Sequence, residues 1–307
     1  MPENLEAQPR RRVPVIVNER SGSGHGTDTY TEIRRLFAQH GMQADIHAAR
    51  SGEELQSCVH EALREHPGVV VAAGGDGTIN AVASSLRGSN VALGILPLGT
   101  RNHFARDLGV PSGLEDAVAA IAKGAAVAVD MGEVNGRTFV NNASLGLYPH
   151  IVRNRKRLQE RQGHRKYWAM LWATLKVVGR HPFMRLKLHL DGRTERWRTP
   201  FVFIGNNDYL MEGFQIGTRS SLRDAKLSVY TAQRRGRLSL LRLGLRALFG
   251  RLKQAEDFIM EEARNVRVES PRRLLLVATD GEVSALPTPL EFRVHPGALR
   301  VLLPKAA

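Results

Sequence analysis

The stretch from Val69 to Asn80 reads Val-Val-Val-Ala-Ala-Gly-Gly-Asp-Gly-Thr-Ile-Asn, an apolar run followed directly by glycines. A continuous run of small and β-branched apolar residues predicts a strand buried on both faces, as in a parallel sheet. The glycines let backbone N–H groups approach an anion, and the N-terminus of a following helix adds partial positive charge. The stretch therefore predicts a strand, a phosphate-binding loop and a helix. A tight turn in which Asp76 and Thr78 act only as helix caps is the alternative.

The sequence on both sides of this stretch alternates between short apolar runs and segments with apolar residues at helical spacing. That alternation predicts an α/β domain with a parallel sheet. We expect strands at residues 13–17, 44–49, 69–73 and 91–96, and helices at 29–40, 53–65, 79–86 and 114–123.

The second half of the chain has a different pattern, because its apolar segments are short, rich in β-branched residues and joined by turns. This pattern predicts a second, mainly antiparallel β domain. We expect its strands at residues 126–134, 137–142, 185–190, 199–204, 226–231, 265–269, 273–279, 290–294 and 299–303.

Two further polar loops follow expected strands of the first domain. One runs from Asn18 to Gly26, and the other reads Pro97-Leu98-Gly99-Thr100-Arg101-Asn102. Loops at the carboxyl ends of parallel strands converge on one crevice, so three such loops predict a nucleotide site. The spacing of the P-loop motif and that of the dinucleotide-binding motif are both missing from these loops.

Length, cysteine count, the length of apolar runs and net charge each limit the kind of protein this sequence can be. The chain has 307 residues, of which 42% are hydrophobic, so it is long enough for one or two globular domains. A single cysteine, Cys58, excludes an internal disulfide and favours a reducing compartment. No uncharged apolar stretch reaches the roughly 18 residues of a membrane span, and we expect a cytoplasmic protein. The net charge of +14 predicts an anionic partner.

Four motifs occur in a characteristic order: Gly74-Gly75-Asp76-Gly77-Thr78, Pro97-Leu98-Gly99-Thr100, Asn141-Asn142-Ala143-Ser144-Leu145-Gly146 and Asp280-Gly281-Glu282. Together they resemble the diacylglycerol kinase catalytic domain family, in particular its soluble bacterial lipid kinases, which are related to sphingosine kinases. The resemblance extends from Val13 to Pro304.

The resemblance implies a kinase of two domains that transfers the γ-phosphoryl group of ATP to the hydroxyl of diacylglycerol or a related lipid. After a polar tail (1–12), residues 13–131 would form the ATP-binding α/β domain and residues 132–307 a β-sandwich that receives the lipid. The implied nucleotide contacts are Asn18, Glu19, Arg20, Ser21, Gly22, Gly74, Gly75, Asp76, Gly77, Thr78, Ile79, Asn80 and Thr100.

The resemblance also assigns the catalytic residues. Glu282 matches the family's general base and Asp280 its neighbour in the site. An alcohol that attacks a phosphoryl group needs an acceptor for its proton, so a carboxylate suits this role. Without the family, Asp280-Gly281 is simply a hairpin turn between two strands.

The resemblance also implies two sites for Mg²⁺. One ion would bridge the phosphates of ATP, and a structural ion would use the Asp224 carboxylate with the carbonyls of Ser221 and Lys226. Oxygen ligands suit Mg²⁺. Arg223, however, could substitute for the charge of the structural ion, and the alternative is a turn that Asp224 caps.

The positive charge is concentrated in two segments. Residues 151–200 have 14 basic and three acidic side chains, and residues 234–253 have seven basic and none acidic, so the rest of the chain has a net charge of −4. Within these stretches, residues 151–180 and 234–253 combine basic with apolar residues at helical spacing. This combination suits docking on an anionic membrane, and we expect a peripheral protein at its inner face. Packing of the apolar residues on the β domain is the alternative.

Two other functions remain open from the sequence: a kinase of a soluble metabolite, similar to NAD kinase, and a lipid-binding module without catalysis. Nucleic acid is not an expected partner, because aromatic residues make up only 6% of the chain and no nucleic-acid-binding motif occurs.

Overall fold

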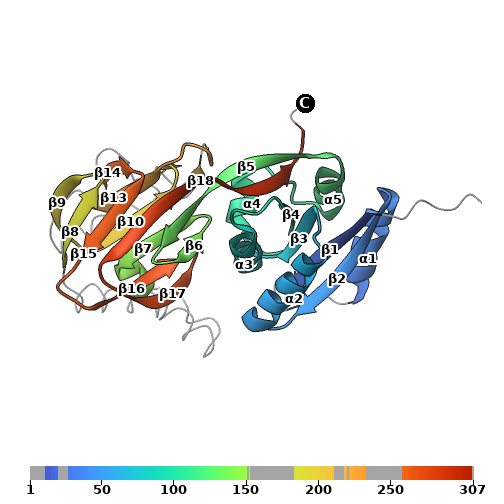
Figure 1. Cartoon of the computed structure of the whole chain (residues 1–307), viewed down its shortest axis with the longest axis horizontal. Helices are drawn as coiled ribbons and strands as arrows, with labels where there is room; N and C mark the ends of the chain where they lie inside the picture. The colour runs from blue at the N-terminus through green and yellow to red at the C-terminus, as the bar shows by residue number, and fades with distance from the viewer. Residues whose placement is uncertain are drawn as a thin grey trace, which may run out of the picture. The chain divides into compact units, whose positions relative to one another are not determined.

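The computed structural model describes residues 11–19, 27–150, 152, 183–210, 218–219, 221–232 and 258–305. The chain divides into two compact units, one made of Met1–Val129 with Gly297–Ala307 and the other of Asp130–Pro296 (Figure 1). The sequence predicted domains at 13–131 and 132–307. In the structure, Gly297–Ala307 belong to the first unit and not to the second. The reason is that the last strand, β18 (Leu290–Leu303), begins in the second unit and ends in the first.

The first unit is a parallel α/β sheet. Its strands are β1 (Arg11–Asn18), β2 (Met42–Ala49), β3 (Val69–Gly74) and β4 (Ala92–Pro97), in the order β2-β1-β3-β4, and the end of β18 pairs parallel to β4. All six residues of β3 and of β4 are buried, as expected for strands with helices on both faces.

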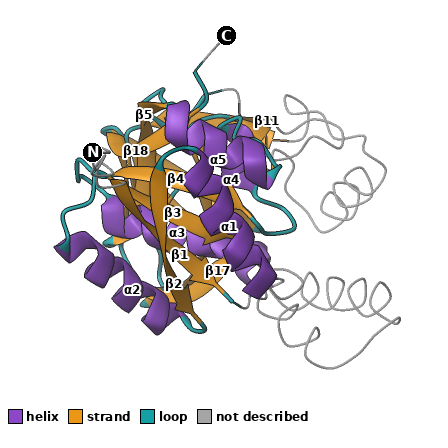
Figure 2. Ribbon diagram, turned by 90° about the vertical axis from the view of Figure 1, so that its right-hand side faces the viewer, coloured by secondary structure: helices purple, strands orange, loops and turns teal. Residues whose placement is uncertain are grey.

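Helices cover both faces of this sheet (Figure 2). Helices α1 (Thr27–Gln39) and α5 (Leu114–Lys123) share one apolar core with the sheet, in which Ile33 and Phe37 meet Val118 and Ile121. Helices α2 (Gly52–Arg64) and α3 (Asp76–Leu86) contact each other on the opposite face. A short helix, α4 (His103–Asp107), follows β4.

The second unit consists of two mainly antiparallel sheets. One has the order β14-β13-β10-β7-β16-β17, formed by Phe258–Ala263, Leu227–Ala232, Phe201–Asn206, Asn142–Gly146, Leu274–Thr279 and Glu282–Pro287. In the other, the first part of β18 pairs with β15 (Asn265–Glu269), β15 with β8 (Met184–Leu190), and β8 with β9 (Arg193–Thr199). Their facing residues, among them Leu188, Val229 and Val277, form one hydrophobic core.

Four further strands form two pairs, and the first of these strands runs from the first unit into the second. Strand β5 (Ala125–Val134) pairs with β6 (Arg137–Phe139), and the two-residue strands β11 (Tyr209–Leu210) and β12 (Thr218–Arg219) pair with each other.

The predicted fold class is confirmed: a parallel α/β unit and an antiparallel β unit. The predicted elements differ from the structure in three ways. Strands β9, β11, β12 and β14 and helix α4 were not expected, residues 137–142 form parts of two strands, and residues 290–303 form one strand across Pro296-Gly297. In the described part of the chain, no helix is long and apolar enough to cross a membrane.

Candidate nucleotide and catalytic site

Three loops of the first unit leave the carboxyl ends of adjacent strands. They follow β1, β3 and β4, and the chain order reverses between β1 and β3, because β2 lies on one side of β1 and β3 on the other. Ligands of open α/β sheets bind in the crevice at such a reversal point. The structure therefore brings Asn18 and Glu19 to the same edge as Gly74–Asn80 and Thr100.

The loops after β3 and β4 approach each other through glycine backbone. A Cβ atom added to Gly99 would lie 2.4 Å from the Cα of Gly75 and 2.6 Å from Oδ1 of Asn102. The N–H of Leu98 donates to the carbonyl of Gly74 at 3.1 Å. Asn102 Nδ2 donates to the carbonyls of Pro97 and Gly99 at 2.9 and 2.7 Å, which closes the second loop on itself. The two motifs therefore form one packed unit.

The first turn of α3 shows what Asp76 and Thr78 do. The N-cap residue of α3 is Gly75, which has no side chain, and the Asp76 carboxylate instead accepts the N–H of Phe104 at 3.4 Å. Thr78 is 3% exposed, and within the described part of the chain its hydroxyl has no hydrogen-bond partner. The alternative in which these two side chains only cap the helix does not describe this turn.

Gly77 differs from the packing glycines. Among the described residues, no heavy atom lies within 4 Å of where its Cβ would be, so its backbone is open to solvent. A glycine at the second position of a helix, with open space before it, lets an anion approach the N–H groups of the first turn.

Glu19 is held by its own neighbours rather than left free for a ligand. Its carboxylate accepts from Nε of Arg50 at 2.7 Å and from the hydroxyl of Tyr30 at 3.3 Å. The hydrogen bond with Arg50 lowers the pKa of Glu19. The remaining residues proposed for this loop, Arg20, Ser21 and Gly22, lie outside the described residues.

In the second unit, Asp280 and Gly281 form the turn between β16 and β17. Their φ angles are +46° and +85°, and Thr279 pairs with Glu282 across the turn. Two consecutive residues with positive φ define the tight hairpin that Asp-Gly favours. The hairpin interpretation from the sequence is therefore correct as a description of the backbone. Glu282 is the first residue of β17 and is exposed.

The Asp280 carboxylate is occupied by backbone donors. Oδ2 accepts the N–H of Val140 at 2.8 Å, and Oδ1 accepts those of Asn141 and Asn142, both at 2.9 Å. Burial raises the pKa of Asp280 to about 6, although the three N–H groups and the charge of Arg219 act in the opposite direction. Asp280 is therefore ionised at neutral pH and ties the hairpin to the segment before β7.

Arg219 also holds the segment before β7, through hydrogen bonds to Val140 and Asn141. It is 7% exposed, and its guanidinium donates to the carbonyl of Val140 and to Oδ1 of Asn141, both at 2.7 Å. Asn206, which is fully buried, donates from Nδ2 to the carbonyls of Val140 and Asp130 at 3.1 and 2.7 Å. Both Nδ2 bonds of Asn206 hold this segment, although Oδ1 of Asn206 has no hydrogen-bond partner among the described residues.

The same network reaches the loop expected to bind structural Mg²⁺. The Asp130 carboxylate accepts the N–H of Ala225 at 2.7 Å, and the hydroxyl of Ser221 donates to Asp224 at 2.6 Å. Lys226 directs its ammonium to Asp208 at 2.6 Å and to Glu262 at 3.0 Å, away from Asp224.

The residues of this loop fit a magnesium ion. The Asp224 carboxylate is exposed, and its possible co-ligands are oxygen atoms, the chemistry that Mg²⁺ requires. The described part of the chain holds no group of three His, Cys, Asp or Glu side chains arranged for a metal, so backbone carbonyls would have to contribute.

Comparisons with known proteins connect both units to one family. Residues 12–134 match the diacylglycerol kinase catalytic domain, and residues 144–303, half of the chain, match the YegS C-terminal NAD kinase beta sandwich-like domain. The chain belongs to the diacylglycerol kinase family. The resemblance predicted from the sequence motifs is thereby confirmed, and membership of this family makes the chain a lipid kinase that uses ATP.

Two diacylglycerol kinases match this lipid kinase over nearly their whole length. It is 28% identical to a diacylglycerol kinase of Bacillus subtilis (strain 168) over 96% of this chain and 97% of the relative. It is also 28% identical to a diacylglycerol kinase of Mycobacterium tuberculosis (strain ATCC 25618 / H37Rv), over 96% of each chain. A crystal structure of a diacylglycerol kinase from Bacillus anthracis superposes with a TM-score of 0.70 at 21% identity, covering 97% of this chain and 98% of that one, which shows the same fold.

Sequence reasoning missed the residues that support the hairpin. Arg219, Asn206 and Asp130 belong to no motif, and their burial becomes visible only when β7, β10 and β12 are brought together. The pair Asn206-Asn207 at the end of an apolar strand was the one signal available, because a strand that ends in two amides needs partners for them.

Proposed function

We propose that this kinase transfers the γ-phosphoryl group of ATP to the hydroxyl of a membrane lipid of the diacylglycerol class, with Glu282 as general base. The names of the full-length relatives support this substrate class. The alternative of a soluble-metabolite kinase has no comparable support, although the second unit matches a domain described as similar to that of NAD kinase.

One observation carries the assignment of the base. The oxygens of Asp280 accept three backbone N–H groups, so most of the acceptor capacity of this carboxylate already holds the turn. Glu282 lies two residues further on and is exposed. We assign Asp280 to positioning the hairpin and Glu282 to accepting the proton of the attacking hydroxyl.

The glycine loops of the first unit would bind the phosphates of ATP. The proposed contacts are Asn18, Gly74–Asn80 and Thr100, with Gly77 offering the most open approach. Phosphoryl transfer depends mainly on positioning and charge stabilisation, which backbone N–H groups and a helix N-terminus supply.

Mg²⁺ bound with ATP supplies positive charge that stabilises the transferring phosphoryl group. A second ion would be held by the Asp224 carboxylate with the carbonyls of Ser221 and Lys226. The role of this loop would be structural, because Asp130 and Asn206 link it to the segment that holds Asp280.

The kinase would act as a peripheral protein at the inner face of the membrane, since its substrate hydroxyl lies at the bilayer interface. Residues 151–180 and 234–253, the two segments expected to dock there, fall outside the described residues apart from residue 152.

The test of the base is Glu282→Gln, compared with Glu61→Gln on the exposed face of α2. We expect Glu282→Gln to lower kcat for phosphorylation of micellar diacylglycerol by about 100-fold or more, the usual contribution of a general base, without changing ATP affinity. The Glu61 variant should retain wild-type kcat. A wild-type kcat in Glu282→Gln would remove this residue from the base role.

The substrate class is tested by transfer of radiolabelled phosphate from ATP to a total lipid extract and, separately, to NAD. Label in a lipid alone supports the proposal. Label in NAD alone would make the chain a soluble-metabolite kinase, and lipid binding without transfer would make it a binding module.

A further inference from the structure

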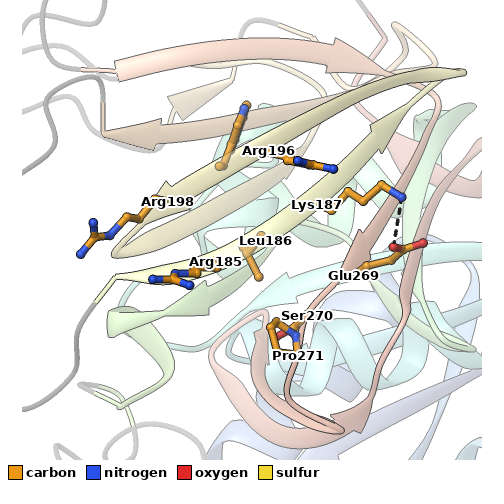
Figure 3. A pocket seen from close by; sticks show the side chains of 9 residues that line it. Arg185, Leu186, Lys187, Arg196, Arg198, Glu269, Ser270 and Pro271 are labelled. Atoms are coloured by element: carbon orange, nitrogen blue, oxygen red, sulfur yellow. Dashed lines mark ion pairs between the residues drawn. The ribbon is translucent and has the colours of Figure 1, made fainter.

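Strands β8 and β9 of the second unit place basic side chains directly opposite one another. In the antiparallel register, Arg185 pairs with Arg198 and Lys187 with Arg196, so all four lie on the same face of the hairpin. The three arginines are exposed. Figure 3 shows Lys187 and Arg196 side by side on the adjacent strands.

This arrangement is unfavourable for the isolated protein. Like charges directly opposite each other on neighbouring strands destabilise a sheet. The acidic side chain nearby is Glu269 on β15, which pairs with Lys187 at 3.5 Å and is shared with His189 at 3.2 Å and Arg267 at 3.5 Å. One shared carboxylate does not neutralise four cations.

Protection of a sheet edge does not explain the pattern. Among the described strands, β9 lies at the end of its sheet, and charged residues on edge strands prevent pairing with other chains. Any mixture of signs would serve that purpose. A cluster of one sign on both strands of the hairpin instead suits an anionic partner.

The cations surround a pocket of about 460 Å³. It is lined by residues of β8 and β9 together with Glu269, Ser270 and Pro271 at the end of β15 (Figure 3). Arginine guanidinium groups bind phosphate oxygens in pairs, and a space of this size admits a phospholipid headgroup.

An exposed apolar side chain follows this pocket in the sequence. Arg272 and Arg273 come directly after Pro271, and Leu274 is 59% exposed, an unusual value for a large aliphatic residue. Three residues of extended chain span at most roughly 10 Å, so Leu274 lies close to the pocket. In a bilayer, arginines can bind the headgroup phosphates while a neighbouring leucine enters the acyl region. A nucleic acid offers phosphates but no apolar layer for the leucine.

We propose that this surface, formed by Arg185, Lys187, Arg196, Arg198, Arg272, Arg273 and Leu274, docks the kinase on an anionic phospholipid bilayer. The inference rests on the proposed function, because a lipid kinase must reach a substrate in the membrane. It assigns the contact to residues outside the segments 151–180 and 234–253. The headgroup phosphates occupy the pocket that β8 and β9 form with Glu269, Ser270 and Pro271, and Leu274 enters the interfacial region.

The test compares two triple variants that remove the same charge. Arg185→Gln/Arg196→Gln/Arg198→Gln alters the proposed surface, and Arg34→Gln/Arg64→Gln/Lys123→Gln alters exposed residues of α1, α2 and α5. Sedimentation with phosphatidylcholine vesicles, with and without phosphatidylglycerol, measures binding in low salt. We expect the first variant to bind anionic vesicles about tenfold more weakly or worse, and the second to bind like the wild type.

Leu274→Ser provides a second measurement that leaves the charges intact. It should weaken binding to anionic vesicles by several-fold, because transfer of the apolar side chain is lost. Wild-type vesicle binding by both the arginine variant and Leu274→Ser would overturn the proposal. Equal losses in the two triple variants would also overturn it, since the effect would then reflect net charge alone.

Two controls separate this proposal from its alternatives. If the arginine variant loses affinity for a DNA duplex but not for vesicles, the surface binds nucleic acid and the proposal fails. Transfer to diacylglycerol in detergent micelles should be unchanged in the arginine variant, because docking is then unnecessary. If the wild type phosphorylates no micellar lipid, the proposed function fails independently of the vesicle result.

Discussion

Asp280 accepts three backbone N–H groups, and this is why we propose Glu282, and not Asp280, as the general base of the Asp-Gly-Glu motif. The sequence identified Asp280-Gly281 in two ways, as a hairpin turn and as part of a kinase site. The hairpin is confirmed, with the Asp280 side chain anchoring the turn and Glu282 at the start of β17, whereas the kinase role of these residues stays a prediction. The partners of Asp280 are backbone atoms 138 to 140 residues away, which no local pattern reveals.

Protonation of Asp280 should lower activity in mild acid. Burial raises the pKa of this carboxyl to about 6, so below that pH an O–H replaces an acceptor that faces a backbone N–H. We expect kcat with micellar diacylglycerol to fall as the pH drops through about 6. Asp280→Asn, a neutral mimic, should have a low kcat that no longer changes in this range.

Protonation of Asp280 does not unfold the protein in mild acid, so unfolding through this residue would not explain a loss of kcat. Because the folded-state pKa lies above the ordinary value of 3.8, the folded chain binds the proton more tightly than the unfolded chain. The contribution of Asp280 to stability therefore increases as the pH falls from about 6 towards 3.8. Circular dichroism at each pH separates the two effects, and a wild-type kcat that stays constant down to pH values near 5 would contradict the prediction.

At the scale of elements, the loops after β3 and β4 contain two kinds of glycine. Gly75 and Gly99 touch backbone to backbone, whereas Gly77 faces open space. The sequence predicted that these loops meet, since parallel strands end at one edge. It could not say which glycine is needed for packing and which is available to a ligand.

Alanine substitution should separate these roles. Gly99→Ala places a Cβ 2.4 Å from the Cα of Gly75, so we expect a loss of about 1–3 kcal/mol in the free energy of unfolding. Gly77→Ala meets no described atom and removes a flexible residue from a helix, so stability should rise by about 0.5–1 kcal/mol.

Gly77→Ala should weaken ATP binding although it does not lower stability. Its new methyl group blocks the approach of phosphate to the first turn of α3, so KM for ATP should rise in a variant that is at least as stable as the wild type. Urea unfolding and ATP titration measure the two effects. If Gly77→Ala binds ATP normally, the phosphates do not approach this turn.

Most elements of the first unit follow from the sequence, because buried parallel strands and amphipathic helices have clear periodicities. Residues 114–123, for example, are helical within the predicted bounds. Strand β9 was missed because Trp197 and Thr199 are its buried residues and its remaining residues are polar. Helix α4 has five residues, too few for a periodic pattern.

At the scale of the whole molecule, the fold class and family could be predicted, but the path of the chain could not. The break expected at Pro296-Gly297 falls where β18 passes from the second unit to the first. A proline and a glycine in sequence indicate a strand end, and only the pairing partners show that the strand continues. β18 pairs with β15 before this point and with β4 after it.

The first unit should therefore depend on residues near the end of the chain. Leu299 is fully buried, and its neighbours Arg300 and Val301 pair with Ala92 and Leu93 of β4. Without this partner, β4 would be an edge strand with an open row of hydrogen-bonding groups. We expect Leu299→Ala to lower the free energy of unfolding by about 2–5 kcal/mol, the usual effect of truncating a buried leucine.

Hydrogen exchange followed by mass spectrometry locates the effect. Peptides covering β3 and β4 should lose protection in Leu299→Ala, while peptides covering β13 in the second unit should keep it, because distant sites add independently. Arg300→Ala, whose side chain is exposed on the same strand, serves as the control and should change stability by less than about 0.5 kcal/mol. Loss of protection confined to β13 would show that the end of the chain does not stabilise the first unit.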